Sequence, residues 1–429
     1  MNKKINIAII GLGQIGIYLY NELNLKKKEI ETKTGKSINI VAISAKNPNK
    51  KRKFKINKKI FYKNPLKIIK GSKIDILFEC IGNSDGISKK VVEKAIKNKI
   101  HVITPNKALI SKHGDYLSKL AEKNKVNLEF EASVGGGIPI LRTIKEGLAT
   151  NIITKVYGIL NGTCNYILSE METSKDTFYN VLKKAQKLGY AEPGNPKLDL
   201  NGYDALSKIK ILSSLSFNKK ISKSKCLMEG IENIESKDFD IADQLNLRIK
   251  LLGITEVIDN KLFERVHPCL VKKNTYIANV GGVMNAVILE GKPVGESVLQ
   301  GEGAGAGPTS SALMSDFLSI LRGNIKYPFG ISQIKRKQIK TYDVNNYVNS
   351  LYLRFEVKDK PGVLSEITKQ LAKYKISIQR LIQIPDNARK KASIIIITHN
   401  IKEYNSKGCM NSFKSNKNII KTPVLIRLF

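Results

Sequence analysis

A short apolar segment that runs into a glycine-rich turn constrains the fold of this chain most strongly. Residues 5–10 read INIAII, residues 11–16 read GLGQIG, and a helical pattern follows. In such a unit the first glycine permits a tight turn, the second lets a pyrophosphate approach the backbone, and the third allows close helix–strand packing. The unit predicts a dinucleotide-binding fold in which the cofactor is held by Gly11, Gly13, Gln14, Ile15 and Gly16.

Strand and helix patterns continue to alternate up to about residue 140. A helical pattern occupies residues 88–99, and strand-like runs lie at residues 38–44, 74–80, 101–106 and 126–133. This alternation predicts a Rossmann-type, doubly wound parallel sheet of the α/β class. Ligands of such sheets lie beyond the carboxyl ends of the strands. Gly82, Thr104 and Lys107 follow these strands, so we expect them at the cofactor.

The end of the second strand bears on the choice between NAD and NADP. An NAD-binding unit usually places an acid there to hold the ribose 2′-hydroxyl. No acid occurs from Asn39 to Lys59, whereas Ser44 and Lys46 are available, together with Lys50, Lys51 and Arg52. A serine and cations suit a 2′-phosphate. The sequence therefore predicts NADP(H) in preference to NAD(H).

The remainder of the chain divides into three further segments. Residues 141–300 mix expected helices (141–149, 176–188 and 203–214) with strand-like runs (155–162 and 275–289), which suggests an α+β substrate domain. Residues 301–322 form a second glycine-rich loop, in which Gly303 can cover a cofactor, and an apolar helix that completes the 1–140 domain. Residues 323–349 are a polar linker. Residues 350–429 have the order βαββαβ of a small ferredoxin-like module.

Composition excludes several classes of protein. The net charge is +36, but of the basic residues 63 are Lys and only 10 are Arg, spread along the whole chain, which argues against a specific nucleic-acid reader. No apolar run is long enough for a transmembrane helix, so no membrane partner is expected. Five scattered cysteines suit reduced thiols and a cytoplasmic location.

A lysine lies on an apolar helix face in the stretch NGYDALSKIKIL, residues 201–212. At helical spacing Lys208 shares its face with Ala205, Ile211 and Leu212, and with Asp204 one turn earlier. An ammonium on an apolar stripe is costly unless it is paired or lines a cleft. Two interpretations remain open: Lys208 lines a reactive cleft, or it only pairs with Asp204 on a solvated face.

Six stretches in order resemble one enzyme family: GLGQIG, TPNKALIS, EASVGGGIPIL, GILNGTCNYILSEM, AEPGNPKLDLNGYDALSKIKIL and GEGAGAGPTSSALMSD. The chain resembles the monofunctional homoserine dehydrogenases, and DKPGVLSEI resembles the signature of a C-terminal ACT domain. The resemblance implies reversible, NAD(P)H-dependent reduction of L-aspartate 4-semialdehyde to L-homoserine in threonine and methionine biosynthesis. It also implies a homodimer or a homotetramer.

The resemblance assigns roles to particular residues. Lys208 matches the proposed proton donor, Lys107 contacts both the cofactor and the reacting centre, and Asp204 and Glu192 bind substrate, with Asp199 in a supporting role. It also implies a monovalent-cation loop, for Na⁺, made of Glu131, Val134, Gly136 and Ile138. Each charged residue could instead be an ordinary surface or helix-end group, and the cation loop an ordinary glycine turn.

The turn at residues 359–362 matches the place where related modules bind amino acids such as threonine. A purely structural oligomerisation module is the alternative.

Two other functions stay open on the residues alone. One is a dehydrogenase for another amino-acid aldehyde or ketone. The other is a non-catalytic amino-acid sensor, against which the intact set of Lys107, Asp204 and Lys208 argues. Oxidation of NADPH in the presence of aspartate semialdehyde would distinguish these possibilities.

Overall fold

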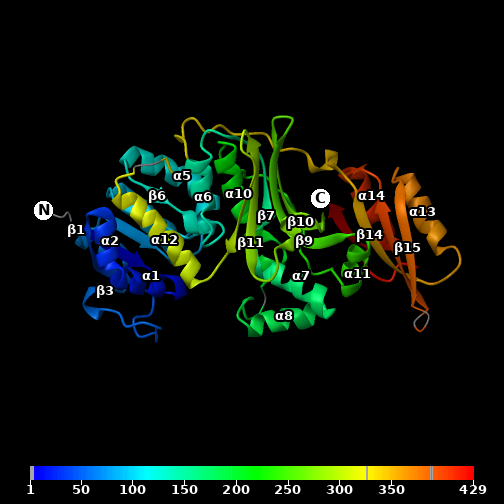
Figure 1. The fold of residues 1–429 in the computed structure, drawn as a ribbon, viewed down its shortest axis with the longest axis horizontal. Helices are drawn as coiled ribbons and strands as arrows, with labels where there is room; N and C mark the ends of the chain where they lie inside the picture. Colours follow the sequence, from blue (N-terminus) through cyan, green and yellow to red (C-terminus); the bar gives the residue numbers. More distant parts are fainter. Residues whose placement is uncertain (1–3, 195, 325–326, 387, 389) are drawn as a thin grey trace.

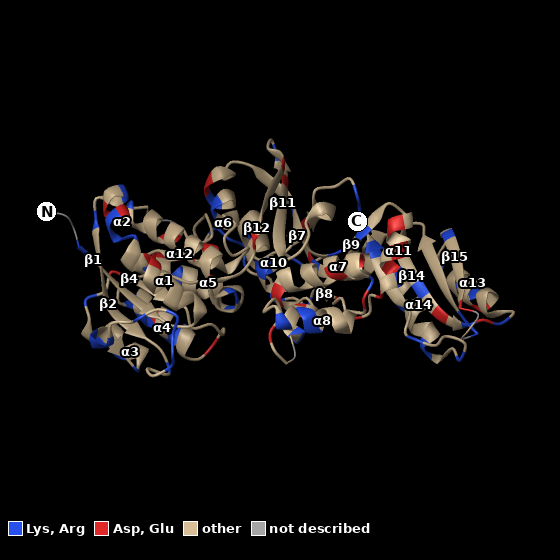
Figure 2. Cartoon of the chain, turned by 60° about the horizontal axis from the view of Figure 1, so that its bottom comes forward, with Lys and Arg blue, Asp and Glu red and all other residues tan. Residues whose placement is uncertain are grey.

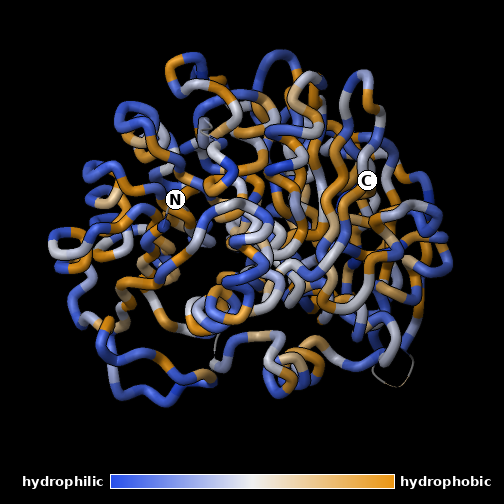
Figure 3. Tube along the Cα trace, turned by 60° about the vertical axis from the view of Figure 1, so that its left-hand side comes forward, coloured by the Kyte–Doolittle hydropathy of each residue, from blue (hydrophilic) through white to orange (hydrophobic). Residues whose placement is uncertain are grey.

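A computed structural model describes residues 4–429 except residues 195, 325–326, 387 and 389. Three parts lie side by side along the long axis of the molecule (Figure 1). The N-terminal part contains the first sheet, the central part a large second sheet, and the C-terminal part extends that second sheet. Hydrophobic residues follow the strands, and hydrophilic residues dominate many of the outer loops (Figure 3).

The N-terminal part is a parallel, six-stranded sheet. Its strands lie in the order β3 (Phe61–Tyr62), β2 (Ser37–Ser44), β1 (Lys4–Ile10), β4 (Ile76–Glu79), β5 (His101–Ile103) and β6 (Leu128–Glu129). The strand order reverses between β1 and β4, which creates the crevice typical of doubly wound folds. This confirms the predicted Rossmann-type class. The last expected strand is shorter than predicted, because residues Glu131–Ser133 form a 3₁₀ turn.

Helices cover both faces of this sheet. Side chains of β1 alternate between two apolar clusters: Ile7 and Ile9 belong to one, Ala8 and Ile10 to the other. The first cluster includes α1 (Gln14–Leu25), α2 (Lys27–Thr34) and α12 (Ala306–Leu321); the second includes α3 (Pro65–Gly71), α4 (Ile87–Lys97) and α5 (Lys107–Asn124). The late helix α12 therefore returns to the first sheet, as the sequence predicted.

The central part is built on a long antiparallel hairpin. Strands β9 (Leu247–Ile258) and β10 (Lys261–Lys272) are joined by Asp259 and Asn260, both at positive φ, and flanked by β7 (Ile152–Ile159), β11 (Met284–Lys292) and β12 (Gly295–Glu302). The sequence analysis did not predict this hairpin. It expected a strand at residues 275–289, of which only the end is extended, because Ile277–Asn279 form a 3₁₀ turn.

Helices contact the central sheet on one side. They are α7 (Gly162–Ser174), α10 (Tyr203–Ser216) and α11 (Ser236–Gln244), with α8 (Phe178–Lys187) outside α7. The helix expected at residues 141–149 is a short α6 (Ile140–Arg142) followed by a π-helical turn at Thr143–Gly147.

The C-terminal part has the predicted βαββαβ order. It comprises β14 (Leu351–Lys358), α13 (Val363–Lys373), β15 (Ile378–Asp386), β16 (Lys391–Thr398), α14 (Glu403–Ser412) and β18 (Val424–Leu428). Its strands lie in the order β18-β14-β16-β15, as in a ferredoxin-like fold. Strand β18 also pairs in parallel with β10, so the central and C-terminal parts share one continuous sheet.

The segment expected to be a linker packs closely against the other parts. Leu262 exchanges backbone hydrogen bonds with Lys340 and Tyr342. Arg336 is buried, donates to the Lys219 carbonyl and forms an ion pair with Asp115 at 2.8 Å. The domain boundaries remain predictions, but the described residues of this segment are held in place.

Two further findings concern the exterior. Lys and Arg occur on elements of all three parts rather than along a single element (Figure 2). Within the described part of the chain, no helix is both long and apolar enough to cross a membrane.

Candidate active site

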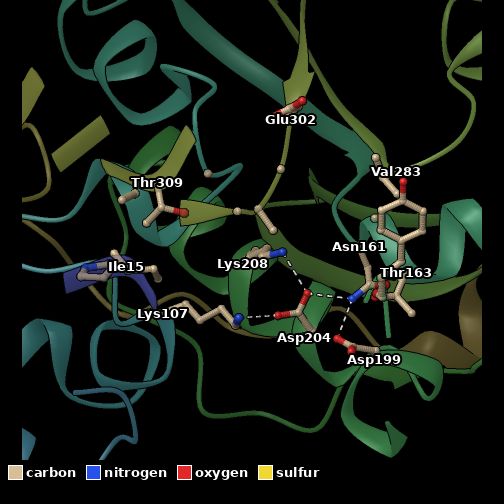
Figure 4. A pocket seen from close by; sticks show the side chains of 18 of the residues that line it. Ile15, Lys107, Asn161, Thr163, Asp199, Asp204, Lys208, Val283, Glu302 and Thr309 are labelled. Carbon is tan, nitrogen blue, oxygen red and sulfur yellow. Dashed lines mark hydrogen bonds and ion pairs between the residues drawn. The ribbon is translucent and has the colours of Figure 1, made fainter. Parts of the chain in front are cut away.

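A cavity of about 620 Å³ lies between the N-terminal and central parts (Figure 4). Its walls come from segments that are distant in the sequence: Ile15 of α1, Lys107 at the start of α5, residues 161–163, α10 and residues 302–305. Of the predicted site residues, it is lined by Ile15, Lys107, Gly136, Asp204, Lys208 and Gly303. The cavity lies at the carboxyl ends of the parallel strands, where a ligand was expected.

The three glycines of the first turn have three different surroundings. Gly11 has φ +98°, and a Cβ there would lie 2.4 Å from the Cys80 carbonyl oxygen. A Cβ at Gly16 would lie 1.8 Å from the Gly11 carbonyl oxygen. Gly13, directly before α1, faces open space. The exposed N-terminus of α1 therefore suits a pyrophosphate, whose charge the helix dipole and free N–H groups favour.

Other predicted cofactor residues lie around this turn. The Ser44 carbonyl accepts from the Gly11 N–H at 2.8 Å, and Lys46 is exposed on the loop that follows. Gly82 has φ +87° and faces open space. Arg52 holds the backbone of the loop after β2, because it donates to the carbonyl of Asn47 and, at 3.4 Å, to the carbonyl of Leu12.

Thr104 supports the crevice from behind instead of facing it. It is fully buried and donates to the Glu79 carboxylate at 2.7 Å. Asn106 joins this network and accepts from the Leu109 N–H at 3.0 Å, which caps α5. The network fixes the start of α5 and thereby the position of Lys107.

Asp204 holds two ammonium groups in the cavity. Its Oδ1 lies 2.7 Å from Lys107 Nζ, and its Oδ2 lies 2.9 Å from Lys208 Nζ (Figure 4). Lys208 also donates to the Leu160 carbonyl. An ammonium has three donors, so one N–H of Lys208 remains for a ligand. The side chain of Lys208 is only 8% exposed, so the interpretation of a solvated face is wrong.

Electrostatics favour the charged forms of Asp204 and Lys107. Burial alone would raise the pKa of Asp204, but Lys208 and Lys107 outweigh burial and hold this pKa well below its usual range. Burial lowers the pKa of Lys107, and the charge of Asp204 and its hydrogen bond reverse the effect, so this pKa lies above its ordinary value. The trio of two lysines and one aspartate thus carries a net positive charge.

Helix α10 can present these groups because small residues let it approach the sheet. Gly202, at φ +85°, precedes the helix, and a Cβ there would lie 2.9 Å from Val266 Cγ1. A Cβ at Gly253 of β9 would lie 2.6 Å from Ile209. Most of the helix is buried, so its polar groups face other residues or the cavity.

Asn161 is a site residue that the sequence analysis missed. Its amide nitrogen donates to Asp199 Oδ1 at 2.8 Å and to Asp204 Oδ2 at 2.9 Å. Its oxygen accepts from the Cys164 N–H at 2.8 Å and caps α7. The sequence signal was an Asn directly after a strand and before a helix, a typical N-cap position.

Two other predicted acids lie in different surroundings. Asp199 lines the cavity, and burial together with the charge of Asp204 raises its pKa. Glu192 is exposed on the loop before Asn195, which is outside the described residues. It does not line the cavity, although its charge helps to raise the pKa of Lys107.

The predicted cation loop is compact, and its carboxylate is hydrogen-bonded to the backbone. The two oxygens of Glu131 accept from the N–H groups of Leu141 and Arg142, each at 2.8 Å. Val134 and Ile138 are buried, and Gly136 at φ +55° faces the cavity. Each oxygen of Glu131 keeps a further lone pair, so the carboxylate and the backbone carbonyls of the loop could both contact a cation. In the described part of the chain, no three His, Cys, Asp or Glu residues are grouped to bind a metal.

The second glycine-rich loop closes the cavity opposite α10. A Cβ at Gly303 would lie 2.0 Å from Asn285 Nδ2, so only glycine fits. Asn285 is 1% exposed, and its amide has no hydrogen-bond partner among the described residues.

The comparisons with known proteins agree with this geometry. The chain matches the family model described as homoserine dehydrogenase over residues 139–318, the NAD-binding domain of homoserine dehydrogenase over residues 11–131, and the ACT domain over residues 351–403. It is 38% identical to the homoserine dehydrogenase of Neisseria gonorrhoeae, with 99% of each chain covered. It is 34% identical to that of Helicobacter pylori, with both chains fully covered.

Solved structures give the same result. The crystal structure of a homoserine dehydrogenase from Thiobacillus denitrificans matches with a TM-score of 0.89 and 34% identity, covering 100% of this chain and 98% of that one. The enzyme from Staphylococcus aureus at pH 7.5 matches with a TM-score of 0.76 and 29% identity, covering 100% of this chain and 99% of that one.

Proposed function

The chain belongs to the homoserine dehydrogenase family, and from that premise we propose how its residues carry out the reaction. The enzyme is an NAD(P)-dependent oxidoreductase that interconverts L-aspartate 4-semialdehyde and L-homoserine. Reduction of the aldehyde builds negative charge on its oxygen. That charge needs a nearby cation and then a proton. The trio of Lys107, Asp204 and Lys208 in the cavity is the observation that supports our assignment.

Lys208 donates the proton to the aldehyde oxygen. Its two acceptors, Asp204 and the Leu160 carbonyl, leave one N–H for the substrate. Asp204 orients Lys208 through Oδ2, and its Oδ1, which lies 2.7 Å from Lys107 Nζ, keeps a lone pair that can accept from the substrate as well. Lys107, whose side chain is 43% exposed, supplies a second positive charge at the cavity wall.

Acids recognise the amino group of the substrate. Asp199 lines the cavity, and only one of its oxygens is bonded to Asn161. Glu192 is exposed outside the lining, and its negative charge helps to raise the pKa of Lys107. We assign Asp199 the direct contact with the substrate ammonium and Glu192 an electrostatic contribution. This raises Asp199 above the supporting role that the sequence suggested.

The cofactor is NADP(H) in preference to NAD(H). The open space at Gly13 and the glycine turn around it fit a dinucleotide pyrophosphate. When bound, NADPH supplies the hydride. The loop after β2 carries Lys46 and no acid, which favours a 2′-phosphate. We also propose a monovalent cation, Na⁺, held by the Glu131 carboxylate and by backbone carbonyls of the 131–138 loop, since oxygen ligands suit a hard cation.

The C-terminal ACT domain makes the enzyme sensitive to a small molecule. We propose threonine or a related amino acid as the effector, and a homodimer or homotetramer as the assembly. A cytoplasmic location fits the reduced cysteines. The structure supports assembly at the sheet edge, where alternate side chains of β12 are exposed.

One experiment tests the central assignment. Purified enzyme should oxidise NADPH when L-aspartate 4-semialdehyde is added and reduce NADP⁺ with L-homoserine. Activity with another amino-acid aldehyde at a higher kcat/KM would contradict the substrate assignment. Reaction rates in the chloride salts of Na⁺, K⁺ and a large organic cation, compared at equal ionic strength, would test the cation site.

A further inference from the structure

A second cavity lies where the central and C-terminal parts of the shared sheet meet, near the end of the chain marked C in Figure 1. We call it the junction cleft. It has a volume of about 360 Å³, and its lining includes Glu256, Arg265, Tyr347, Asn349, Asn400 and Phe429. None of the residues described as lining it also lines the catalytic cavity. The cleft is large enough for a small amino acid.

Arg265 is buried here with part of its guanidinium unpaired. The group stacks between the rings of Phe263 and Tyr347, at 4.2 and 4.7 Å, and its Nη2 lies 2.7 Å from Glu256 Oε1. Its Nε and Nη1 have no hydrogen-bond partner among the residues that the structure describes. The residue is only 1% exposed. Unpaired N–H groups of a buried cation are costly and call for an acceptor.

Asn349 also lines the cleft with unpaired polar atoms, and unlike Arg265 it offers an acceptor as well as donors. It is 6% exposed, and within the described chain neither its amide oxygen nor its amide nitrogen has a partner. It lies on β13 (Val348–Asn349), which pairs with β17 (Ile401–Lys402) and thereby joins the C-terminal part. An unpaired amide can both donate to and accept from one ligand.

The charges of the cleft suit a zwitterion. Arg265 and Lys155 are positive, and Lys155 Nζ lies 4.2 Å from the centre of the Phe429 ring. Glu256 is negative, and its side chain is 20% exposed. A ligand carboxylate would satisfy Arg265 and a ligand ammonium would face Glu256, whereas a simple anion would be repelled by that acid.

We propose that the junction cleft binds a small zwitterionic α-amino acid and is the effector site of this enzyme. The inference rests on the proposed regulation by an amino acid. It differs from the expectation that the turn at residues 359–362 holds the effector. All four residues of that turn are exposed in the single chain, so a ligand there would need a second copy of the module to enclose it.

Strand β10 connects the cleft to the catalytic helix. Arg265 faces the cleft, and the next residue, Val266, packs on the opposite side against Gly202. Gly202 directly precedes α10, which carries Asp204 and Lys208. A ligand that reorients Arg265 therefore acts on the strand that supports the catalytic helix. The coupling follows from this contact, and inhibition measurements test it.

The test uses the full-length enzyme and L-threonine as the probe. Isothermal titration measures its binding, and initial rates measure inhibition. In Asn349→Leu the probe should bind at least about 10-fold more weakly, with the uninhibited rate unchanged. Arg265→Lys provides a second variant in the cleft. Asn346→Leu, on the same segment but outside the cleft, is the matched control. Thermal melting of each variant verifies that it is folded.

The outcomes separate the two proposals. Loss of binding and inhibition in Asn349→Leu, with both retained in Asn346→Leu and Asp359→Ala, supports the junction cleft. Inhibition that survives in Asn349→Leu but disappears in Asp359→Ala places the effector at the turn and overturns the inference, while regulation stands. If L-threonine neither binds nor inhibits the unmodified enzyme, both proposals are wrong.

Discussion

At the scale of single residues, one carboxylate organises the chemistry. Asp204 is shared by two lysines and by Asn161, and its charge raises the pKa of Lys107 (Figure 4). Lys208 is the more deeply buried of the two lysines, with 8% of its side chain exposed against 43% for Lys107. We therefore expect different effects when each is removed.

Lys208→Ala should lower kcat by about 10²–10⁴-fold, the usual contribution of a general acid. Binding of NADPH, measured by fluorescence titration, should change little, because Lys208 lies on the substrate side of the cavity. Lys210→Ala, on the same helix and pointing away, is the matched control and should keep full activity. A Lys208→Ala enzyme with most of its activity would contradict the assignment.

Gly303→Ala should disrupt the loop that closes the cavity. The new Cβ would lie 2.0 Å from Asn285 Nδ2, so either the loop or the buried amide must move. We expect a loss of kcat/KM of at least about 10-fold, equivalent to 1.4 kcal/mol. Gly305→Ala has more space, with Pro308 Cδ at 3.4 Å, but φ +114° makes it strained as well. A double variant, Gly303→Ala with Asn285→Ala, should recover part of the activity if the collision is the cause.

Residue types and spacing were sufficient to predict that Lys208 and Asp204 share a helix face, because an i,i+4 pair is visible in the sequence, whereas their roles followed from the family resemblance. They were not sufficient for Asn161, whose two carboxylate partners lie 38 and 43 positions away. They also could not show that Thr104 faces Glu79 instead of the cofactor. Such facts depend on which side chains the fold brings together.

At the scale of elements, the unit β1–α1–β2 sets the cofactor preference. NADPH should be used with a kcat/KM at least about 10-fold above that for NADH, or 1.4 kcal/mol. Ser44→Asp should shift the preference toward NADH, since a carboxylate there would repel a 2′-phosphate. Ser44→Asn is the matched control, with similar size and no charge. Binding and turnover should be measured separately. Equal binding of both cofactors by the unmodified enzyme would contradict the prediction.

Strand β10 carries a histidine that should make stability depend on pH. Burial of His267, and then the charges of Arg427 and Arg265, hold the pKa of its imidazole well below the usual value. The unfolded chain therefore takes up a proton below about pH 6.5 that the folded chain refuses. Stability is complete above that pH and falls by about 1.4 kcal/mol per pH unit below it.

Denaturant unfolding between pH 7.5 and 5 measures this dependence. In His267→Leu the slope below pH 6.5 should be reduced. The matched control is His399→Leu, which changes an exposed histidine. An identical slope in the unmodified enzyme and in His267→Leu would show that other groups dominate.

The hairpin β9–β10 has a turn signal in the sequence. Strand β9 is rich in β-branched residues, and the two strands flank Asp259 and Asn260, whose positive φ values are those of a type I′ turn. By contrast, the 3₁₀ turn at Ile277–Asn279 has no such signal, since its residues also suit a strand. The hairpin could have been predicted from its turn residues. The 3₁₀ turn could not, because it depends on tertiary packing.

At the scale of the whole molecule, the C-terminal part is integrated into the enzyme. The βαββαβ order was predictable from local patterns, but the parallel pairing of β18 with β10 was not, because its paired residues, such as Cys269 and Arg427, are 158 positions apart. Helix α11 adds a second contact: Asp238 accepts from Tyr352 Oη at 2.6 Å and from Arg354 Nε at 2.7 Å. The side chains of Asp238 and Arg354 are 0% and 1% exposed.

Asp238→Asn should therefore loosen the C-terminal part. Arg354 would still have Glu356 at 2.9 Å and Glu235 at 3.4 Å, so the loss should be smaller than the about 3–5 kcal/mol of a buried charge left without any partner. We expect a lower Tm and faster proteolytic release of residues from about 350 onward, measured by mass spectrometry. The matched control is Asp240→Asn on the same helix. Its pair with Lys175 is half exposed on both sides and should contribute no more than about 1 kcal/mol.

If the two variants melt alike and release the same fragments, the buried pair does not hold the C-terminal part to the central sheet. In that case the pairing of β18 with β10 alone would have to hold it.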